Sequence, residues 1–147
     1  MELDRDQSPG YVVNLVARLF AQALHRRISP YGVVPGQFPA LLCLYEEDDL
    51  TQAELCRRVT IEQPTMANTL NRMERDGLIR RKPDPLDGRQ MRISLTSRAR
   101  RLEGRLSSMA NEVNAIALRG MRPAEAKSVL PILNKIAENL RRDAPGA

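Results

Sequence analysis

Apolar residues recur at intervals of three and four along most of the chain, a spacing that places them on one face of a helix. The first such stretch covers residues 11–28, and a shorter one covers residues 38–46. Two long stretches, roughly residues 97–118 and 123–142, form the C-terminal part of the chain. The pattern predicts a mainly helical protein, in which Pro131 should kink or shorten the last helix.

Residues 50–96 follow a different pattern, in which two short helices precede two strands. Thr51 and Glu54 have the spacing of a capping box, so we expect a helix to begin at Thr51. The next helix is predicted from about Gln63 to Asp76, with Gly77 as its stop. The connection between the two helices is short, which is typical of a helix-turn-helix unit.

Two strands are predicted after these helices, over residues 78–82 and 90–95. Between them, residues 83–88 are rich in the proline, aspartate and glycine that form turns. In the second strand Met91, Ile93 and Leu95 alternate with polar residues. The sequence therefore predicts a β-hairpin with one apolar face and one polar face.

The helix predicted at residues 63–76 also has two faces. Met66, Leu70 and Met73 fall on one side and should pack against the preceding helix. The residues of the opposite side are Pro64, Thr65, Asn68, Asn71, Arg72 and Arg75. Threonine, asparagine and arginine can reach phosphates and base edges, so this side suits the major groove of DNA. The alternative is an ordinary solvated amphipathic helix.

The positive charge of the chain is concentrated around the hairpin. The whole chain has a formal net charge of +5, with 23 basic and 18 acidic residues. Residues 72–101 alone contain ten basic and four acidic residues, so the remainder is close to neutral. A basic segment of this kind favours a polyanionic partner.

The hairpin tip carries Arg89, which we expect to enter the minor groove, where the negative potential is concentrated. Four basic residues on the strands are expected to meet phosphates: Arg80, Arg81, Lys82 and Arg92. Asp87 is interpreted as an intramolecular partner of an arginine that holds the tip in shape. The alternative for the whole hairpin is a charged solvent edge that discourages aggregation.

The sequence offers little material for other chemistry. It lacks the phosphate-cradling glycine loop, serine elbow and paired Cys-His pattern of common enzymes, so we expect binding rather than catalysis. His25 is the one histidine and has no ligand partners at metal-site spacing, so no metal or cofactor is expected. Cys43 and Cys56 are interpreted as packing residues rather than redox sensors. The acidic N-terminus differs from a secretory signal, and we expect a cytoplasmic protein.

Residues 50–96 resemble the MarR-type winged-helix regulators. The matching motifs are LTQAEL (50–55), ERDGLIRR (74–81), DPLDGR (84–89) and ISLT (93–96), and IEQPT (61–65) followed by Leu70 resembles the SlyA-like branch. The resemblance implies a mainly α fold with a small β-hairpin wing in a single domain, residues 1–147. It also implies dimerisation helices in residues 10–34 and 97–142 and a DNA-binding lobe in residues 35–96.

The resemblance implies a homodimeric, sequence-specific transcriptional regulator, most simply a repressor, that binds an inverted-repeat operator in double-stranded DNA. The residues expected at the DNA are Gln63, Pro64, Thr65, Asn68, Thr69, Arg72, Arg75, Arg80, Arg89 and Arg92. The alternative is a winged-helix module that binds protein and has no specific DNA site.

The resemblance further implies release from DNA by a small aromatic or phenolic ligand. The residues expected to line its pocket are Arg18, Tyr31, Phe38 and Cys43. Arg18 would anchor a ligand carboxylate there, but a surface arginine or an intersubunit salt bridge is the favoured interpretation of this residue. Core packing is the corresponding alternative for Tyr31 and Phe38.

Overall fold

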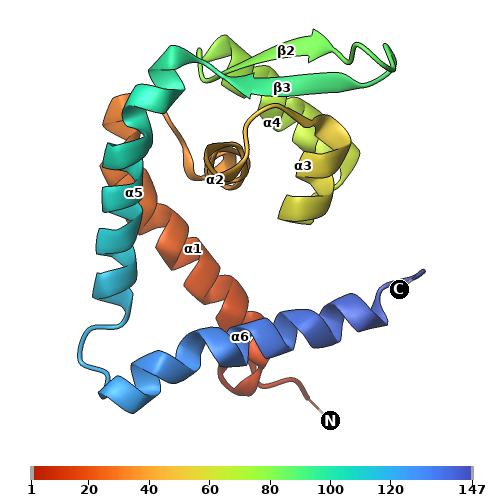
Figure 1. Cartoon of the computed structure of the whole chain (residues 1–147). Helices are drawn as coiled ribbons and strands as arrows, with labels where there is room; N and C mark the ends of the chain where they lie inside the picture. Colours follow the sequence, from red (N-terminus) through yellow and green to blue (C-terminus); the bar gives the residue numbers. More distant parts are fainter. Residues whose placement is uncertain (1, 147) are drawn as a thin grey trace. The chain divides into compact units, whose positions relative to one another are not determined.

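The computed structural model describes residues 2–146, which form mainly helices and one small sheet (Figure 1). The chain divides into two compact units, one up to Val113 and one from Asn114 onwards, and each is considered by itself. The helices are α1 (Pro9–Ile28), α2 (Phe38–Glu46), α3 (Gln52–Val59), α4 (Gln63–Arg75), α5 (Ser97–Ala117) and α6 (Pro123–Asp143). The strands are β1 (Leu50–Thr51), β2 (Ile79–Pro83) and β3 (Met91–Leu95). Three short 3-10 turns occupy Arg5–Gln7, Ser29–Tyr31 and Pro35–Gln37.

The helix-turn-helix unit begins and ends where local sequence signals place it. The Thr51 hydroxyl accepts a hydrogen bond from the Glu54 N–H at 3.1 Å, which confirms the predicted cap of α3. At the other end of α4, Gly77 has a φ of +74°, a left-handed conformation that favours glycine. The Leu78 N–H then bonds the Met73 carbonyl at 2.9 Å and closes the helix. The predicted stop is confirmed, although α4 ends at Arg75, one residue early.

The sheet is antiparallel with strand order β1-β3-β2. Residues Ile79 to Pro83 pair with Leu95 to Met91, so the predicted hairpin is present, with its first strand shifted by one residue. Strand β1 was not predicted, and it pairs Leu50 with Ile93 on the other side of β3. A two-residue strand has no periodicity of its own, and the sequence pattern therefore could not reveal it.

The core of the first unit lies among α2, α3, α4 and the sheet. Met66, Leu70 and Met73, the predicted apolar side of α4, are all buried. Ile93 and Leu95 are buried on β3, as their alternation indicated. This core fixes the orientation of α4, because burying one side leaves the other facing away from the protein.

The second unit consists of the end of α5 and helix α6. Helix α6 runs through Pro131 without interruption, so the predicted shortening at this residue is wrong. Pro131 is exposed, and its missing N–H leaves a carbonyl one turn earlier that water can satisfy. No residue from Asn114 to Gly146 is buried.

Candidate nucleic-acid interface

The outward side of α4 carries most of the residues that the sequence assigned to DNA. Gln63, Pro64, Thr65, Asn68, Arg72 and Arg75 are all exposed there, as is Asn71. Thr69 is half-buried at the edge of this surface. Because the opposite side of the helix is packed in the core, these side chains form one rigid surface of donors and positive charge.

The wing, residues 79–95, projects from the helices of the first unit as a narrow hairpin (Figure 1). Its tip presents Arg89, whose side chain is 91% exposed. The Asp87 carboxylate accepts bonds from the Arg89 backbone N–H and from Nε, both at 3.1 Å. The predicted intramolecular partner of the tip arginine is thus confirmed. Nη1 of Arg89 has no protein partner among residues 2–146 and can donate outward.

The turn of the wing is organised around Asp84. One carboxylate oxygen accepts the N–H of Leu86 at 2.7 Å and that of Asp87 at 3.3 Å. The other accepts from Arg92 Nη1 at 3.1 Å. These bonds, that of the Leu86 N–H first, hold the pKa of Asp84 below its usual range. The carboxylate therefore stays ionised at neutral pH and fixes the shape of the tip.

Arg92 anchors the base of the wing. Its Nε donates to the Asp49 carboxylate at 3.0 Å, and its Nη2 donates to the Asp49 carbonyl at 2.6 Å. With the bond to Asp84, all three guanidinium nitrogens are engaged by protein oxygens. This geometry favours an anchoring role for Arg92 over the phosphate contact expected from the sequence. Asp49 has a φ of +60°, so the acidic turn adopts a left-handed conformation to reach the guanidinium.

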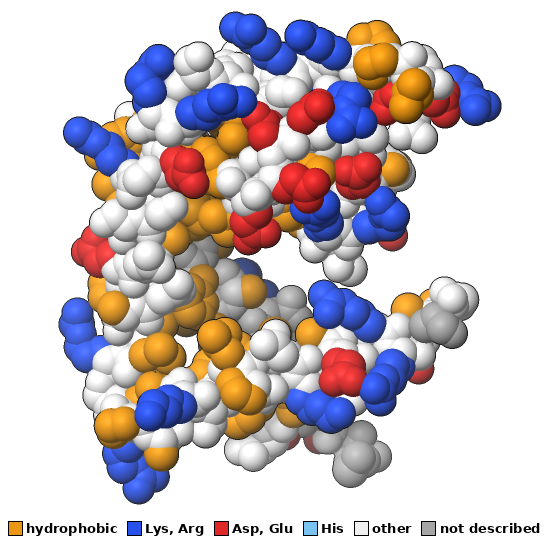
Figure 2. Space-filling view, in the orientation of Figure 1, with side chains coloured by type: hydrophobic (Ala, Val, Ile, Leu, Met, Phe, Trp, Pro, Cys, Tyr) orange, Lys and Arg blue, Asp and Glu red, His pale blue; other side chains and the backbone are white. Residues whose placement is uncertain are grey.

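A second ion pair joins the wing to α4. Arg81 Nη2 donates to the Glu74 carboxylate at 3.0 Å, and this bond lowers the pKa of Glu74. Arg80, the neighbouring residue on β2, is exposed. Figure 2 shows blue side chains over the strands and at the far tip of the wing, with red carboxylates between them. Part of the positive charge of this region therefore holds the lobe together, and part is open to a ligand.

The C-terminal end of α4 is fixed by a polar cluster. Gln37, only 3% exposed, donates from Nε2 to the Asp76 carboxylate at 2.9 Å. Arg98 at the start of α5 donates to the carbonyls of Asp76 at 2.8 Å and Tyr31 at 2.6 Å. The end of the recognition surface is thus tied to both α5 and the segment after α1.

The same arrangement of helices and wing occurs in proteins of known structure. Residues 34–91 match the model of the MarR family. A MarR transcriptional regulator from Methanosarcina mazei Go1 has 27% identity and a TM-score of 0.85, over 92% of this chain and 97% of that one. Residues 34–91 therefore form a MarR-family domain.

Two further solved structures have the same fold as this chain. The PcaV transcriptional regulator from Streptomyces coelicolor, in complex with its natural ligand, has 23% identity and a TM-score of 0.83, covering 94% of this chain and 97% of that one. Reduced AbfR bound to DNA has 22% identity and a TM-score of 0.78, covering 90% of this chain and 89% of that one. The fold is that of a winged-helix transcriptional regulator, while the SlyA-like branch stays a prediction.

The residues predicted to line a ligand pocket lie in different surroundings. Phe38 is 6% exposed and belongs to the core, whereas Arg18 is exposed on α1. Tyr31 is half-buried under the Arg105 guanidinium, which lies 5.7 Å from the ring centroid. Cys43 is half-buried, and burial raises the pKa of its thiol, which favours packing over redox chemistry. A shared pocket for these four residues stays a prediction.

Among residues 2–146, no group of three or more histidine, cysteine, aspartate or glutamate side chains is placed to hold a metal ion. None of the helices over the same residues has the length and apolar character needed to cross a membrane.

Proposed function

We propose that this chain is a homodimeric, sequence-specific DNA-binding repressor. In this proposal α4 enters the major groove and the wing enters the adjacent minor groove. The observation that carries the proposal is the rigid pairing of two exposed surfaces, the polar side of α4 and the wing with Arg89 at its tip. The DNA complex of AbfR, a protein of the same fold, supports it.

The proposed contacts divide by chemistry. Asn68 and Arg72 on α4 are the best candidates for base edges, because amide and guanidinium groups can form paired bonds to adenine and guanine. Gln63, Pro64, Thr65, Thr69 and Arg75 surround them on the same helix. Arg80 is placed to meet a phosphate, and Arg89 to meet the minor groove.

The proposed homodimer rests on apolar surface outside the lobe. Helix α1 exposes a set of large apolar side chains: Tyr11, Val12, Val13, Leu15, Val16, Leu19 and Phe20. The second unit exposes another set: Ile116, Met121, Leu130, Ile132, Leu133 and Leu140. Exposed apolar side chains gathered on a helix mark an interaction site, and a second copy of the chain is the proposed occupant. The two symmetry-related DNA-binding lobes of such a dimer would select an inverted repeat with half-sites about 34 Å apart.

We also propose that a small aromatic or phenolic compound releases the DNA. Support comes from the ligand complex of PcaV and from the cationic and aromatic character of Arg18 and Tyr31. The test is a set of aromatic carboxylates and phenols added to the protein–DNA complex. Arg18→Ala should abolish release by carboxylates and leave DNA binding intact. Release that is unchanged in this variant would remove Arg18 from the site.

The decisive experiment selects bound duplexes from a random library and then measures affinity for the best one against salt. A DNA-binding protein should select an inverted repeat, and its affinity should fall steeply as salt rises, because phosphate contacts release counterions. Arg89→Ala should weaken binding while the protein remains a dimer. A protein-interaction module would instead select no duplex, and that result would overturn the proposal.

Base reading and repression have separate tests. Asn68→Ala should change the preferred sequence if Asn68 touches a base, whereas an equal loss on all sequences would indicate a phosphate contact. Repression should appear as reduced transcription from a promoter that overlaps the selected site. Increased transcription from that template would make the protein an activator.

A further inference from the structure

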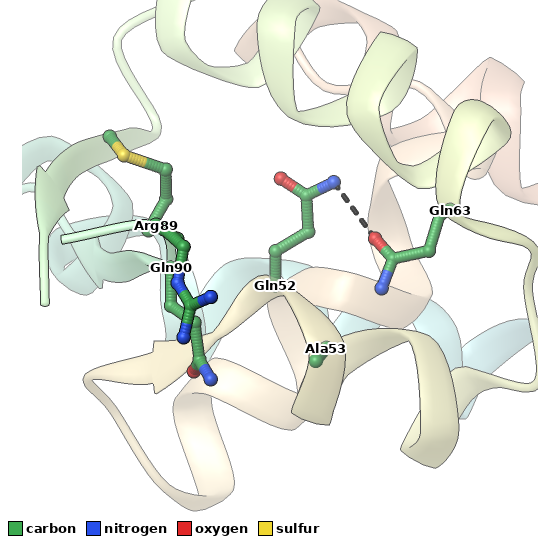
Figure 3. A pocket seen from close by; sticks show the side chains of 6 residues that line it. Gln52, Ala53, Gln63, Arg89 and Gln90 are labelled. Atoms are coloured by element: carbon green, nitrogen blue, oxygen red, sulfur yellow. Dashed lines mark hydrogen bonds between the residues drawn. The ribbon is translucent and has the colours of Figure 1, made fainter. Parts of the chain in front are cut away.

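A hollow of about 190 Å³ lies between the first turns of α3 and α4 and the turn end of the wing (Figure 3). The residues that line it are Gln52, Ala53, Gln63, Arg89, Gln90 and Met91. Gln52 Nε2 donates to Gln63 Oε1 at 3.1 Å, so one amide positions the other across the two helices. This bond leaves the Gln63 amide nitrogen able to donate into the hollow.

The polar side chains that line the hollow offer hydrogen-bond donors and carry no negative charge. Three amides and one guanidinium supply donors, and no carboxylate is among the six lining residues. Arg89 is bonded to Asp87, which is not among the lining residues, through Nε and Nη2, and its Nη1 stays available as a donor. Ala53 contributes only a methyl group, which leaves room for a bulky group to approach. Such a site suits an anion that presents several acceptor oxygens.

The place of the hollow identifies that anion if the proposed function is correct. When α4 occupies the major groove and the wing the next minor groove, the DNA strand that separates the grooves must pass between them. The hollow lies in that passage. We propose that it seats one phosphate of the DNA backbone, and that Gln52 and Gln90 contact it together with Gln63 and Arg89. Gln52 and Gln90 carry no sequence signal that distinguishes them from ordinary surface glutamines.

Gln52→Glu separates this role from a structural one. The change keeps the size of the side chain, and Gln63 can rotate its amide to donate to the new carboxylate. A negative charge in the first turn of α3 also favours the helix, so thermal stability should be unchanged or higher. DNA affinity should nevertheless fall by about tenfold or more, because the carboxylate faces a phosphate. Gln7→Glu, at an exposed position in the turn before α1, is the control for added charge and should bind nearly as tightly as the parent.

The contacted phosphate can be located by chemical substitution. In a set of selected duplexes, each phosphate near the centre of a half-site is replaced in turn by a neutral methylphosphonate. One position should weaken binding of the parent protein by about three- to tenfold, the range expected for a charge-assisted hydrogen bond open to solvent. That same substitution should cost Gln52→Ala much less, since the contact is already absent.

The outcomes distinguish this inference from the proposed function beneath it. If the parent protein binds no duplex, the proposed function fails and the inference falls with it. If the parent binds specifically but Gln52→Glu binds equally well, the hollow takes no phosphate. The same conclusion holds if every methylphosphonate costs Gln52→Ala as much as it costs the parent. A loss of affinity accompanied by unfolding of Gln52→Glu would assign Gln52 to the structure of the lobe instead.

Discussion

Helix α4 and helix α1 have similar apolar periodicity, yet they bury it in different ways. Leu70 in α4 is fully buried, whereas Leu19 in α1 is 53% exposed. The same contrast holds more widely, because every buried apolar residue among residues 2–146 lies between Ile28 and Val113. The lobe therefore completes its core within one chain, while α1 and α6 keep large apolar side chains exposed. An amphipathic pattern predicts a helix equally well in both cases, but it does not say which molecule covers the apolar face.

The largest expected effect tests the lobe side of this contrast. Leu70→Ala should lower the free energy of unfolding by about 2–5 kcal/mol, since it opens a cavity in a packed core. The matched change Leu19→Ala should have little effect on unfolding of the lobe and should instead weaken self-association. Urea denaturation followed by circular dichroism measures the first effect, and sedimentation equilibrium measures the second.

Leu19→Glu provides the stronger form of the second test, because it places a charge in the proposed dimer interface. It should yield a folded monomer with weak DNA binding. Asn14→Asp is the control, since it adds a negative charge to the polar side of the same helix and should remain dimeric. A Leu19→Glu protein that stays dimeric would show that α1 is not the dimer contact, and the contrast between the two helices would need another explanation.

Pro131 allows the same contrast to be tested in α6, the other helix with exposed apolar side chains. The helix passes through this residue with one backbone hydrogen bond missing, and no side chain of α6 is buried within the described chain. Pro131→Ala restores the bond and should stabilise the helix by about 1–3 kcal/mol, given the low helix propensity of proline. A higher melting temperature with unchanged dimer affinity is the expected result. A lower melting temperature would show that the dimer requires the bend that proline imposes.

Sequence reasoning worked best where one local signal decides the outcome. The Thr51 cap, the Gly77 stop and the buried face of α4 each follow from a few neighbouring residues. The order of helix, turn, helix and hairpin then led to the family, and the exposed residues of α4 followed from the helix period. These features depend on contacts close in sequence, which is why pattern and propensity are enough to find them.

The features that the sequence did not predict depend on contacts between residues far apart in the chain. The anchor of the wing joins Arg92 to Asp49 across 43 positions, and the sequence showed only an acidic turn and a basic strand. Strand β1 exists only because β3 offers it an edge. The hollow at Gln52 is likewise assembled from three segments, and no local pattern shows that their residues come together. Such features follow from tertiary packing, and they determine which arginines are open to DNA and which are already bound.

A smaller effect is expected at the polar cluster that ends α4. Asp76→Ala removes the acceptor of the Gln37 amide N–H, and Gln37 is only 3% exposed. An unsatisfied buried donor should reduce the free energy of unfolding by about 1–3 kcal/mol. Because Asp76 also lies at the start of the turn into the wing, DNA affinity should fall in the same variant. Denaturation and binding measured on one preparation check both, and a loss of binding without destabilisation would make Asp76 a DNA-facing residue.

The smallest expected effect is on the stability of the fold at low pH. Hydrogen bonds from Gln37 and then Arg75 hold the pKa of Asp76 below its ordinary value of 3.8. A lowered pKa means that the ionised carboxylate stabilises the fold above the unfolded pKa, and that this contribution is lost as the pH falls through the folded pKa. Asp76→Asn cannot titrate, so the variant should be less stable than the parent at pH 7 and should lose less stability between pH 5 and pH 3. The difference should be below about 1 kcal/mol because the carboxylate is partly solvated. Urea midpoints across this range measure it, and parallel curves for parent and variant would show that other carboxylates control the acid response of the lobe.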